Sequence, residues 1–474
     1  MMGKAVTGST NWVGRRVTVM GLGVLGGGVG AARYLASHGA IVTVTDMRDA
    51  TALSESIAQL DGLPITYHLG AHDLGDFTRD GADVVVRNPG VPMDSPYLLA
   101  ARESGVDIEM EMSIFFRDCP APIIGITGTK GKTTVSALIG SILRAWNSDS
   151  LLAGNMGLSA LMELDRLTPE TPVALELSSF QIESLNDHGL GPHVAVLTNI
   201  FPDHLDRYRD FEHYAATKRG LAHSMGPTDL VVYNAGDPEA SRVAEETGAR
   251  LVPFGLSQRA GDGAWLDGDR LACTLDGKTL TFERPDILSL EGHHGATNAL
   301  AAIAAAMAYG VPETAIREGL TTFAGVENRL EIVGTGAGVT YVNDTSATAP
   351  VAAVAGVRVL GPRARHLHLL AGGADKKTDL TPFADELSRT AVTVYLLDGT
   401  ATPGLQSLLE ERYVPISGTF DSMASAVDAA ISNAAPGDYI ALCPACASFG
   451  MFRNEFDRGE QFRRAVQRHL SLSS

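Results

Sequence analysis

The sequence predicts an α/β protein of three domains, and three observations support this. A chain of 474 residues holds about three domains at roughly 150 residues each. Gly is abundant at 51 residues and aromatic side chains make up only 6%, as in Ala/Val/Leu-rich helices that pack on parallel strands joined by Gly turns. Short apolar strands, each followed by a Gly turn and a helix, recur along the sequence.

The charge balance and the apolar pattern exclude several classes of protein. Lys and Arg total 37 and Asp and Glu total 55, so the net charge is −18, whereas nucleic acids and anionic membranes bind basic surfaces. No apolar stretch of about 18 residues is free of charged residues and Gly, so we expect no membrane span. The first fifteen residues lack the apolar core of a signal peptide, and four cysteines are too few for a disulfide scaffold. We therefore expect a cytoplasmic protein.

The first unit, residues 1–110, has the pattern of a dinucleotide-binding fold. RRVTVMGLG is a short apolar strand that runs into a Gly turn, and Gly21–Gly26 matches G-x-G-x-x-G. A helix to Ala36 and a second strand ending at Asp46 follow, so an acidic residue stands about 20 residues after the turn. A tight turn that binds no ligand remains the alternative for this Gly run.

The second unit, residues 111–325, opens with a phosphate loop. APIIGITGTKGKTTVSALIGSIL is a buried strand, a Gly loop and a helix, and the loop ends in G-K-T. It departs from the strict G-x-x-x-x-G-K-[ST] pattern because Ile126 holds the first Gly position. Gly128 and Gly131 allow backbone N–H groups to approach phosphate oxygens, and the helix N-terminus adds its dipole. Lys132 supplies a positive charge and Thr133 a hydroxyl for Mg²⁺.

Two later strands of the second unit end in polar residues. VALELSSFQIE is a strand followed by a polar turn, and VAVLTNIFPDHLDRY is a strand that ends in Asp203–Arg207. Acidic and imidazole side chains at strand ends beside a phosphate loop suit a metal ion or a reacting phosphoryl group. A lone His is usually structural, but His204 stands among two acids and an Arg, which favours a functional role. An Ala-rich helix from Ala299 ends at Gly310, and we place the domain boundary near Val326.

The third unit, residues 326–474, repeats the alternation of strands and helices. GVTYVNDTSATAP, HLHLLAGGADKK, TVYLLDG and DYIALCPACASFGMF each contain a strand followed by a turn. Cys443 and Cys446 form a C-x-x-C, but no second pair or thioredoxin-like context accompanies it, so we interpret both as packing residues. The predicted architecture is a Rossmann-like N-terminal domain, a central P-loop-type ATPase α/β domain and a C-terminal Rossmann-like α/β domain.

Several segments spread over nearly the whole chain resemble the Mur ligase family. In order and spacing they are GTKGKTT, ELSSFQIE, NIFPDHLDRY, a later Lys218, TNALAA, ENRLE, NDTSAT and CPACASF. The resemblance is closest to the glutamate-adding branch of this family. It implies that the first domain binds the UDP end of one substrate, the central domain ATP and the third domain glutamate. The implied reaction joins glutamate to UDP-N-acetylmuramoyl-L-alanine through an acyl phosphate in peptidoglycan synthesis, while ATP is cleaved to ADP and phosphate.

The resemblance assigns roles around the phosphate loop. Lys132, His204 and Lys218 are implied to act in catalysis. Lys218 matches a lysine that the family carries as a carbamate, an anion that ligates metal where an ammonium cannot. The implied Mg²⁺ ligands are Thr133, Glu176, His204 and Lys218. The residues implied to bind ATP are Gly128, Thr129, Lys130, Gly131, Lys132, Thr133, Thr134, Asn298, Arg329 and Asp344.

The resemblance also assigns the other two substrates, and it implies a monomer. The Gly turn of the first domain then receives UDP rather than NAD. The residues implied to bind the UDP substrate are Gly23, Val24, Leu25, Asp46, Asn155, Ser179 and Gln181. The residues implied to bind glutamate are Thr348, Lys376, Ser448 and Phe456.

The departures from the family pattern lie where glutamate binds. DTSATA, from Asp344, stands where the family usually has D-S-K-A-T-N, so a Lys and an Asn are missing. Glu455 stands where an aromatic residue is expected, and Phe456 is displaced by one position. Lys376 still matches the lysine that pairs with the side-chain carboxylate, and a buried acid without a partner costs several kcal/mol. Rebuilt contacts around a retained cation suggest the other enantiomer, so we expect L-glutamate, with D-glutamate as the alternative.

Three other functions fit parts of the sequence. An NAD(P)-dependent oxidoreductase fits Gly21–Gly26 but has no use for a phosphate loop. A non-catalytic nucleotide-binding regulator has no need to combine Lys132, Glu176, His204 and Lys218. A folate-type or cyanophycin-type amide ligase is disfavoured by the uracil-site match in the first domain.

Overall fold

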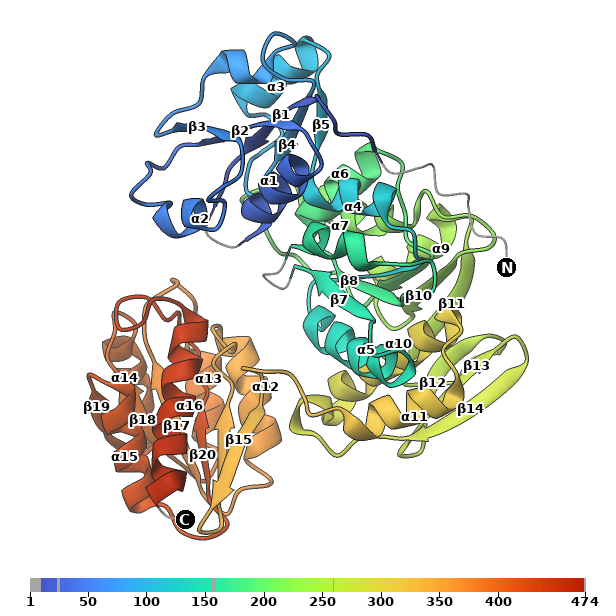
Figure 1. The fold of residues 1–474 in the computed structure, drawn as a ribbon. Coiled ribbons are helices and arrows are strands. Elements are labelled where there is room, and N and C mark those ends of the chain that lie inside the picture. The colour runs from blue at the N-terminus through green and yellow to red at the C-terminus, as the bar shows by residue number, and fades with distance from the viewer. Residues whose placement is uncertain (1–9, 24–25, 156–158, 259, 473–474) are drawn as a thin grey trace. The chain divides into compact units, whose positions relative to one another are not determined.

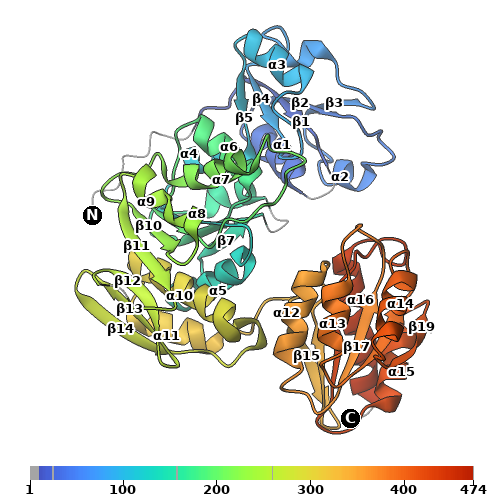
Figure 2. The same cartoon turned by 180° about the vertical axis from the view of Figure 1, so that it is seen from behind.

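The described part of the chain has the expected α/β fold, built on parallel sheets with helices packed against them (Figures 1 and 2). The computed structural model describes residues 10–23, 26–155, 159–258 and 260–472. The chain separates into two compact units. One holds the chain up to Pro285 together with Ala296–Phe323, and the other holds Asp286–Gly295 together with the chain from Ala324 on. The domain limits at residues 110 and 325 stay predictions.

The first sheet has the strand order β3-β2-β1-β4-β5, and all its pairings are parallel. Because β1 lies between β2 and β4, its carboxyl end is a switch point of the kind where open α/β sheets bind ligands. The predicted Gly turn follows β1 there. The strands are β1 Arg16–Met20, β2 Ile41–Asp46, β3 Ile65–Leu69, β4 Val84–Arg87 and β5 Asp107–Glu109. The helices are α1 Gly27–Ser37, α2 Ser54–Ala58, η1 Leu74–Phe77 and α3 Pro96–Glu103.

The second sheet has the strand order β14-β13-β12-β11-β10-β9-β6-β8-β7. β6 lies between β8 and β9, so its carboxyl end is a switch point too, and the predicted phosphate loop follows it. The strands are β6 Ile123–Thr127, β7 Leu151–Gly154, β8 Val173–Glu176, β9 Val194–Leu197, β10 Leu230–Asn234, β11 Arg250–Gly255, β12 Gly263–Asp267, β13 Arg270–Leu275 and β14 Lys278–Glu283. The helices are α4 Glu111–Asp118, α5 Lys132–Trp146, η2 Ala160–Arg166, α6 Ser179–Asp187, α7 Phe211–Arg219, η3 Gly220–Ala222, α8 Pro238–Ser241, α9 Val243–Glu246, α10 Gly292–Tyr309 and α11 Glu313–Thr322. The short helix η4 Leu288–Leu290 lies in the segment that belongs to the other unit.

The antiparallel extension of the second sheet was missed in the sequence. β12, β13 and β14 form two successive hairpins, whereas the strands from β7 to β12 pair in parallel. The signal was present in the turns: Asp276 and Gly277 both have positive φ, +50° and +74°, as the two-residue Asp-Gly hairpin turn requires. The extension lies at the sheet edge remote from β6 in strand order, so it does not alter the phosphate loop.

The third sheet has the strand order β15-β16-β20-β17-β18-β19, with one antiparallel pair, β15 and β16, at its edge. The strands are β15 Glu331–Gly336, β16 Val339–Asn343, β17 Leu367–Gly372, β18 Val392–Leu397, β19 Ile416–Phe420 and β20 Tyr439–Leu442. The helices are α12 Pro350–Leu360, α13 Thr381–Leu387, α14 Thr402–Glu411, α15 Met423–Asn433 and α16 Glu455–Leu472. The inner strands β17 and β18 are buried on both faces, which is why they read as continuous apolar runs.

Alternation along β17 separates two cores on the faces of the third sheet. Leu369 packs with residues of α12, α13 and α14, while Leu370 packs with residues of α15 and α16. Cys443 and Cys446 are free and buried in the first of these cores, as packing residues should be. Burial raises the pKa of both thiols, which keeps them unreactive.

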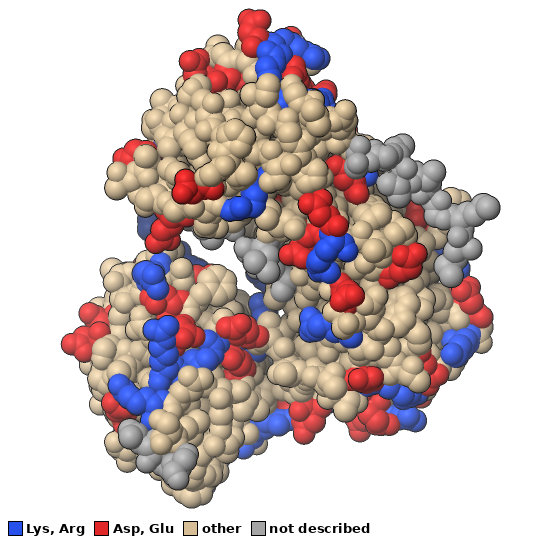
Figure 3. Space-filling model, viewed as in Figure 1, with Lys and Arg blue, Asp and Glu red and all other residues tan. Residues whose placement is uncertain are grey.

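The surface carries charges of both signs. On the face shown in Figure 3, Lys and Arg side chains stand among Asp and Glu, with wide areas of other residues between them. Within the described ranges, every helix is either too short or too polar to cross a membrane. Selective binding of anionic groups therefore depends on local sites rather than on the net charge of −18.

Candidate functional site

The phosphate loop lies between the carboxyl end of β6 and the first turn of α5. Gly128 and Gly131 have φ of +148° and +84°, which residues with a Cβ rarely adopt. A Cβ on Gly128 would lie 1.9 Å from Thr198 Oγ1, so the loop also needs the space. Because α5 begins at Lys132, its first N–H groups and the positive end of its dipole face the loop. This is the arrangement that binds a phosphate group.

Polar residues after β9 hold the phosphate loop in place. Thr198 Oγ1 donates to the backbone oxygen of Lys130 at 2.7 Å, and the Lys130 backbone N–H donates to Asn199 Oδ1 at 2.8 Å. The Thr129 hydroxyl accepts from the backbone N–H of Phe201 at 2.9 Å. Thr129 was predicted to bind ATP, and its hydroxyl is used to anchor the loop. Thr198 and Asn199 were not predicted; their signal is their position directly after a buried strand beside β6.

Two lysines reach the same carbonyl oxygen of the loop. Lys132 Nζ donates to Gly128 O at 2.9 Å and to Thr129 O at 3.2 Å. Lys218, on α7, is buried, and its Nζ also donates to Gly128 O at 2.9 Å. Burial lowers the pKa of Lys218 well below its usual value, and the neighbouring Lys132 charge lowers it further. A neutral amine is the nucleophilic form that reacts with CO₂, so this environment suits the predicted carbamate.

Thr133 and Glu176 are the predicted Mg²⁺ ligands that the structure brings together. Thr133 Oγ1 donates to Glu176 Oε1 at 3.4 Å, and Glu176, at the end of β8, is buried. Hydroxyl and carboxylate oxygens are ligands that Mg²⁺ prefers, so the pair fits this ion. His204 lies on an exposed loop, with its ring 5.1 Å from the Phe180 ring. Among the described residues no three His, Cys, Asp or Glu side chains form a metal-holding group. The carbamate at Lys218 stays a prediction.

The other predicted ATP residues of this unit differ in their surroundings. Lys130 is exposed, and its Nζ lies 3.7 Å from an Asp203 carboxylate oxygen. Thr134 is buried in the first turn of α5. Asn298, on α10, lies against the phosphate loop, because a Cβ on Gly131 would be 2.6 Å from its Oδ1 atom. Asn298 is therefore next to the loop, as its predicted contact with ATP requires.

Replacing Gly131 with alanine is expected to weaken ATP binding by about tenfold or more and to lower the free energy of unfolding by about 1–3 kcal/mol. The new Cβ would meet Asn298 Oδ1 at 2.6 Å, at a φ of +84°. Gly310→Ala is the matched control, since Gly310 has a φ of +88° with nothing within 4 Å of its Cβ position. Denaturant unfolding and the KM for ATP check both variants. An unchanged KM for ATP in Gly131→Ala would contradict the role of this loop.

The Gly turn after β1 and Asp46 come together, as predicted. The Gly23 backbone N–H donates to Asp46 Oδ2 at 3.1 Å, and the Arg48 backbone N–H donates to Asp46 Oδ1 at 2.9 Å. Asp46 is buried, so its carboxylate fixes the turn. Asn88 was not predicted, yet its Nδ2 donates to Gly21 O at 3.4 Å. It follows the buried strand β4, which neighbours β1, and this position is its only signal in the sequence.

The predicted residues on the muramoyl side lie near β8. Ser178 and Gln181 form a capping box, in which Gln181 Oε1 accepts from the backbone N–H and the hydroxyl of Ser178, both at 2.9 Å. Ser179 is buried in the first turn of α6. Asn155 follows β7 and is exposed, and its backbone N–H donates to the backbone oxygen of Glu176 at 2.8 Å. Two further predicted residues lie outside the described part of the chain: Val24 and Leu25.

Three of the four residues predicted to bind glutamate lie at the carboxyl edge of the third sheet. They lie on the loops after β16, β17 and β20, which are neighbours in the sheet. Lys376 Nζ donates to Thr348 Oγ1 at 3.0 Å. The loops after β17 and β20 pair through Ala374 and Ala447, with backbone hydrogen bonds of 2.9 and 3.1 Å. Ser448 follows Ala447, and its buried hydroxyl has no hydrogen-bond partner among the described residues.

Helix α16 contributes one predicted and one unpredicted residue to this edge. Phe456, the fourth residue predicted to bind glutamate, lies in the first turn of α16 and is 62% exposed. Arg458 was missed: it is fully buried and donates to the hydroxyl and backbone oxygen of Thr345, both at 3.0 Å, and to Cys446 O at 3.1 Å. It therefore fixes the loops after β16 and β20 relative to one another. An Arg on a charged helix carries no sign of this role in the sequence.

Arg329 and Asp344 come together in the C-terminal unit. Asp344 is buried, its Oδ1 accepts from the backbone N–H of Leu330 at 3.2 Å, and the Cys443 sulfur lies 3.6 Å from its Oδ2. Burial raises the pKa of Asp344 to about 7, and the Arg329 charge acts in the opposite direction. The phosphate loop belongs to the other unit, so the contact of both residues with ATP stays a prediction.

Comparison with known proteins agrees with this arrangement of sheets. Profiles of three domains match: "Mur ligase MurD-like, N-terminal domain" at residues 15–109, "Mur ligase middle domain" at 126–306 and "Mur ligase, glutamate ligase domain" at 328–446. A UDP-N-acetylmuramoylalanine–D-glutamate ligase of Roseiflexus sp. (strain RS-1) is 48% identical, covering 96% of this chain and 98% of its own length.

Two further similarities extend over almost the entire chain. A protein of the same name from Symbiobacterium thermophilum is 36% identical, covering 95% of this chain and 98% of its own. The crystal structure of the UDP-N-acetylmuramate–alanine ligase of Thermotoga maritima shares the fold, with a TM-score of 0.59 and 20% identity over 97% of this chain and all of that chain. On the domain profiles and the identity to these relatives, the chain belongs to the Mur ligase family.

Proposed function

We propose that this protein joins D-glutamate to UDP-N-acetylmuramoyl-L-alanine and uses ATP, which becomes ADP and phosphate. The observation that carries the proposal is the phosphate loop at the switch point of β6, with the buried Lys218 bonded to Gly128 O at 2.9 Å. A loop of this kind serves phosphoryl transfer and has no purpose in an NAD(P)-dependent oxidoreductase. The names of the relatives at 48% and 36% identity supply the two other substrates.

The names of the relatives favour D-glutamate over the L-glutamate expected from the sequence. That expectation depended on the missing Lys and Asn of the DTSATA segment and on Glu455. The Lys376–Thr348 hydrogen bond of 3.0 Å shows a cation kept at the carboxyl edge of the third sheet. A cation kept at this edge is compatible with D-glutamate, so the altered segment does not require a change of substrate. We therefore adopt the alternative, D-glutamate.

The proposed chemistry assigns a task to each group of residues. A carboxylate is a poor acyl donor, and phosphorylation gives it a good leaving group that the amine of glutamate can displace. Lys132 and the N–H groups of the loop would hold the phosphates and stabilise the charge that develops between them. Thr133 and Glu176 would hold Mg²⁺, which neutralises phosphate charge when bound. We further propose a monomer that acts in the cytoplasm, in line with the resemblance.

Phosphate release tests the proposal directly. With UDP-N-acetylmuramoyl-L-alanine and ATP present, D-glutamate is expected to support release at least about 100-fold faster than L-glutamate, because a misplaced carboxylate loses a charged contact. Reactions without the UDP substrate and reactions with NADH in place of ATP are the controls. Faster release with L-glutamate would reverse the assignment of the enantiomer. Absence of release with both enantiomers would refute the proposed function.

A further inference from the structure

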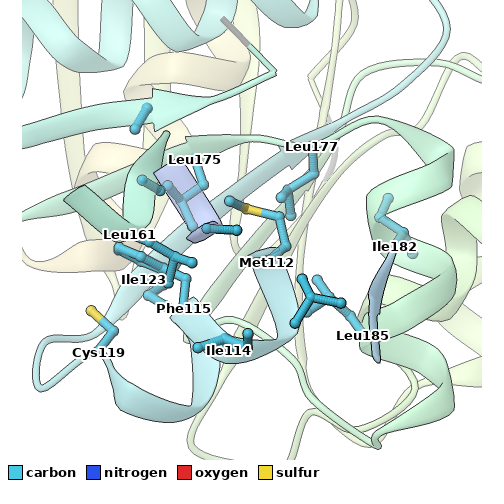
Figure 4. Packing of buried hydrophobic residues seen from close by; sticks show 14 of the residues in the cluster. Met112, Ile114, Phe115, Cys119, Ile123, Leu161, Leu175, Leu177, Ile182 and Leu185 are labelled. Atoms are coloured by element: carbon cyan, nitrogen blue, oxygen red, sulfur yellow. The ribbon is translucent and has the colours of Figure 1, made fainter. Parts of the chain in front are cut away.

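The apolar side of helix α4 belongs to the hydrophobic core of the second sheet. Figure 4 shows its apolar side chains packed against residues of β6, β8, η2 and α6. The labelled members of this cluster are Met112, Ile114, Phe115, Cys119, Ile123, Leu161, Leu175, Leu177, Ile182 and Leu185. Because α4 is held on its apolar side, a polar group at its first residue has a fixed position.

Glu111, the first residue of α4, bonds to the segment that follows the muramoyl-side loop. The Ser159 hydroxyl donates to Glu111 Oε1 at 2.5 Å, and the backbone N–H groups of Ala160 and Leu161 lie near enough to the same carboxyl group to favour its charged form. The carboxyl group is thus held at the start of η2. Glu111 is partly exposed, and the burial of its carboxyl group raises its pKa to about 7.

The same carboxyl group lies against the start of α1, which follows the UDP-side turn. A Cβ on Gly27 would be 3.1 Å from Glu111 Oε2, and a Cβ on Gly30 would be 2.0 Å from Ser159 Oγ. The space at Gly30 excludes any Cβ unless Ser159 moves, and the space at Gly27 is tight, so the two glycines let α1 approach Ser159 and Glu111 closely. The described ends of the two predicted substrate loops, Gly23 and Asn155, are a few residues from these contacts.

We propose that Glu111 and Ser159 are positioning residues that hold the starts of α1 and η2, the helices that follow the two predicted substrate loops, in register. The proposal rests on the proposed function, since it concerns a substrate whose two ends bind these two loops. A ligand that bridges two sites gains affinity from their fixed separation, whereas a ligand of one site does not. The pair therefore sets the affinity for the whole UDP-substrate rather than for UDP.

Calorimetric titration of variants tests the pair. Glu111→Ala and Ser159→Ala are each expected to weaken binding of UDP-N-acetylmuramoyl-L-alanine about tenfold, with binding of UDP alone and of ATP within about twofold of wild type. Glu111→Gln keeps an acceptor oxygen and is expected to recover most of the loss. Equal weakening of the whole substrate and of UDP would overturn the proposal, as would no weakening of either.

Asp118 supplies the matched control. It is a buried carboxylate at the other end of α4, and it accepts from the backbone N–H and the hydroxyl of Thr10 at 3.1 and 2.9 Å and from Tyr34, on α1, at 3.5 Å. Asp118→Ala is expected to lower stability and to leave the affinity ratio between the whole substrate and UDP unchanged. If the wild-type protein binds ATP but neither the whole substrate nor UDP, the proposed function has failed. If only the positioning proposal is wrong, the wild-type protein still binds both the whole substrate and UDP.

Discussion

Replacing Lys132 with alanine is expected to reduce phosphate release by about 10²–10³-fold, the loss typical of removing one group that stabilises transition-state charge. Lys132 Nζ is 2.9 Å from Gly128 O and 3.2 Å from Thr129 O, so the ammonium is held at the loop. Phosphoryl transfer relies on positioning and charge neutralisation, and alanine removes both at this point. The rate under saturating substrates measures the effect.

The stability of the Lys132→Ala variant separates a catalytic loss from a folding defect. Its free energy of unfolding is expected to stay within about 1 kcal/mol of wild type, because the side chain is partly exposed. Lys278→Ala is the control, since Lys278 is an exposed lysine on β14 whose Nζ lies 3.8 Å from Glu313. Turnover by Lys132→Ala at the rate of Lys278→Ala would exclude the mechanism given above.

The parts of the site that lie on one segment could be predicted from the sequence. In the phosphate loop, strand, glycines, lysine and helix follow one another within a few residues, so local geometry alone brings Gly128, Lys132 and the helix N-terminus together. The turn between β1 and α1 could be predicted for the same reason. Thr348 and Lys376 could also be predicted, because each follows a strand that is recognisable in the sequence. Their placement follows from the rule that ligands bind at the carboxyl ends of parallel strands.

Contacts between distant segments could not be predicted in this way. Arg458 bonds to Thr345, 113 residues earlier, and Ser159 bonds to Glu111 across two different elements. The residues themselves carry no signal, because a charged side chain on a helix usually faces solvent and only packing of the completed fold buries it. The position of His204 relative to Glu176 is likewise set by a loop after β9, not by sequence spacing.

Lys218→Met is expected to lower phosphate release at least about 100-fold while leaving the free energy of unfolding unchanged or about 1–2 kcal/mol higher. Lys218 is 2% exposed on α7, and its Nζ bonds to Gly128 O, an oxygen that Lys132 Nζ also reaches. Methionine fills a similar volume without a buried polar group, and Gly128 O keeps a donor. Release assays and denaturant unfolding measure the two effects separately. Bicarbonate is expected to raise wild-type activity in CO₂-depleted buffer and to leave the variant unchanged.

The pH dependence of stability tests the buried amine of Lys218 itself. Its pKa is lowered in the folded protein, chiefly by burial, so in CO₂-depleted buffer the unfolded chain binds a proton that the folded chain does not. The wild-type free energy of unfolding should therefore rise with pH between the lowered pKa and the ordinary value of 10.5, and this contribution should level off below the lowered pKa, where both states bind the proton. Lys218→Met should lack this slope. Parallel curves for the two proteins would mean that Lys218 is not buried as a neutral amine, and its suitability for a carbamate would lose its physical basis.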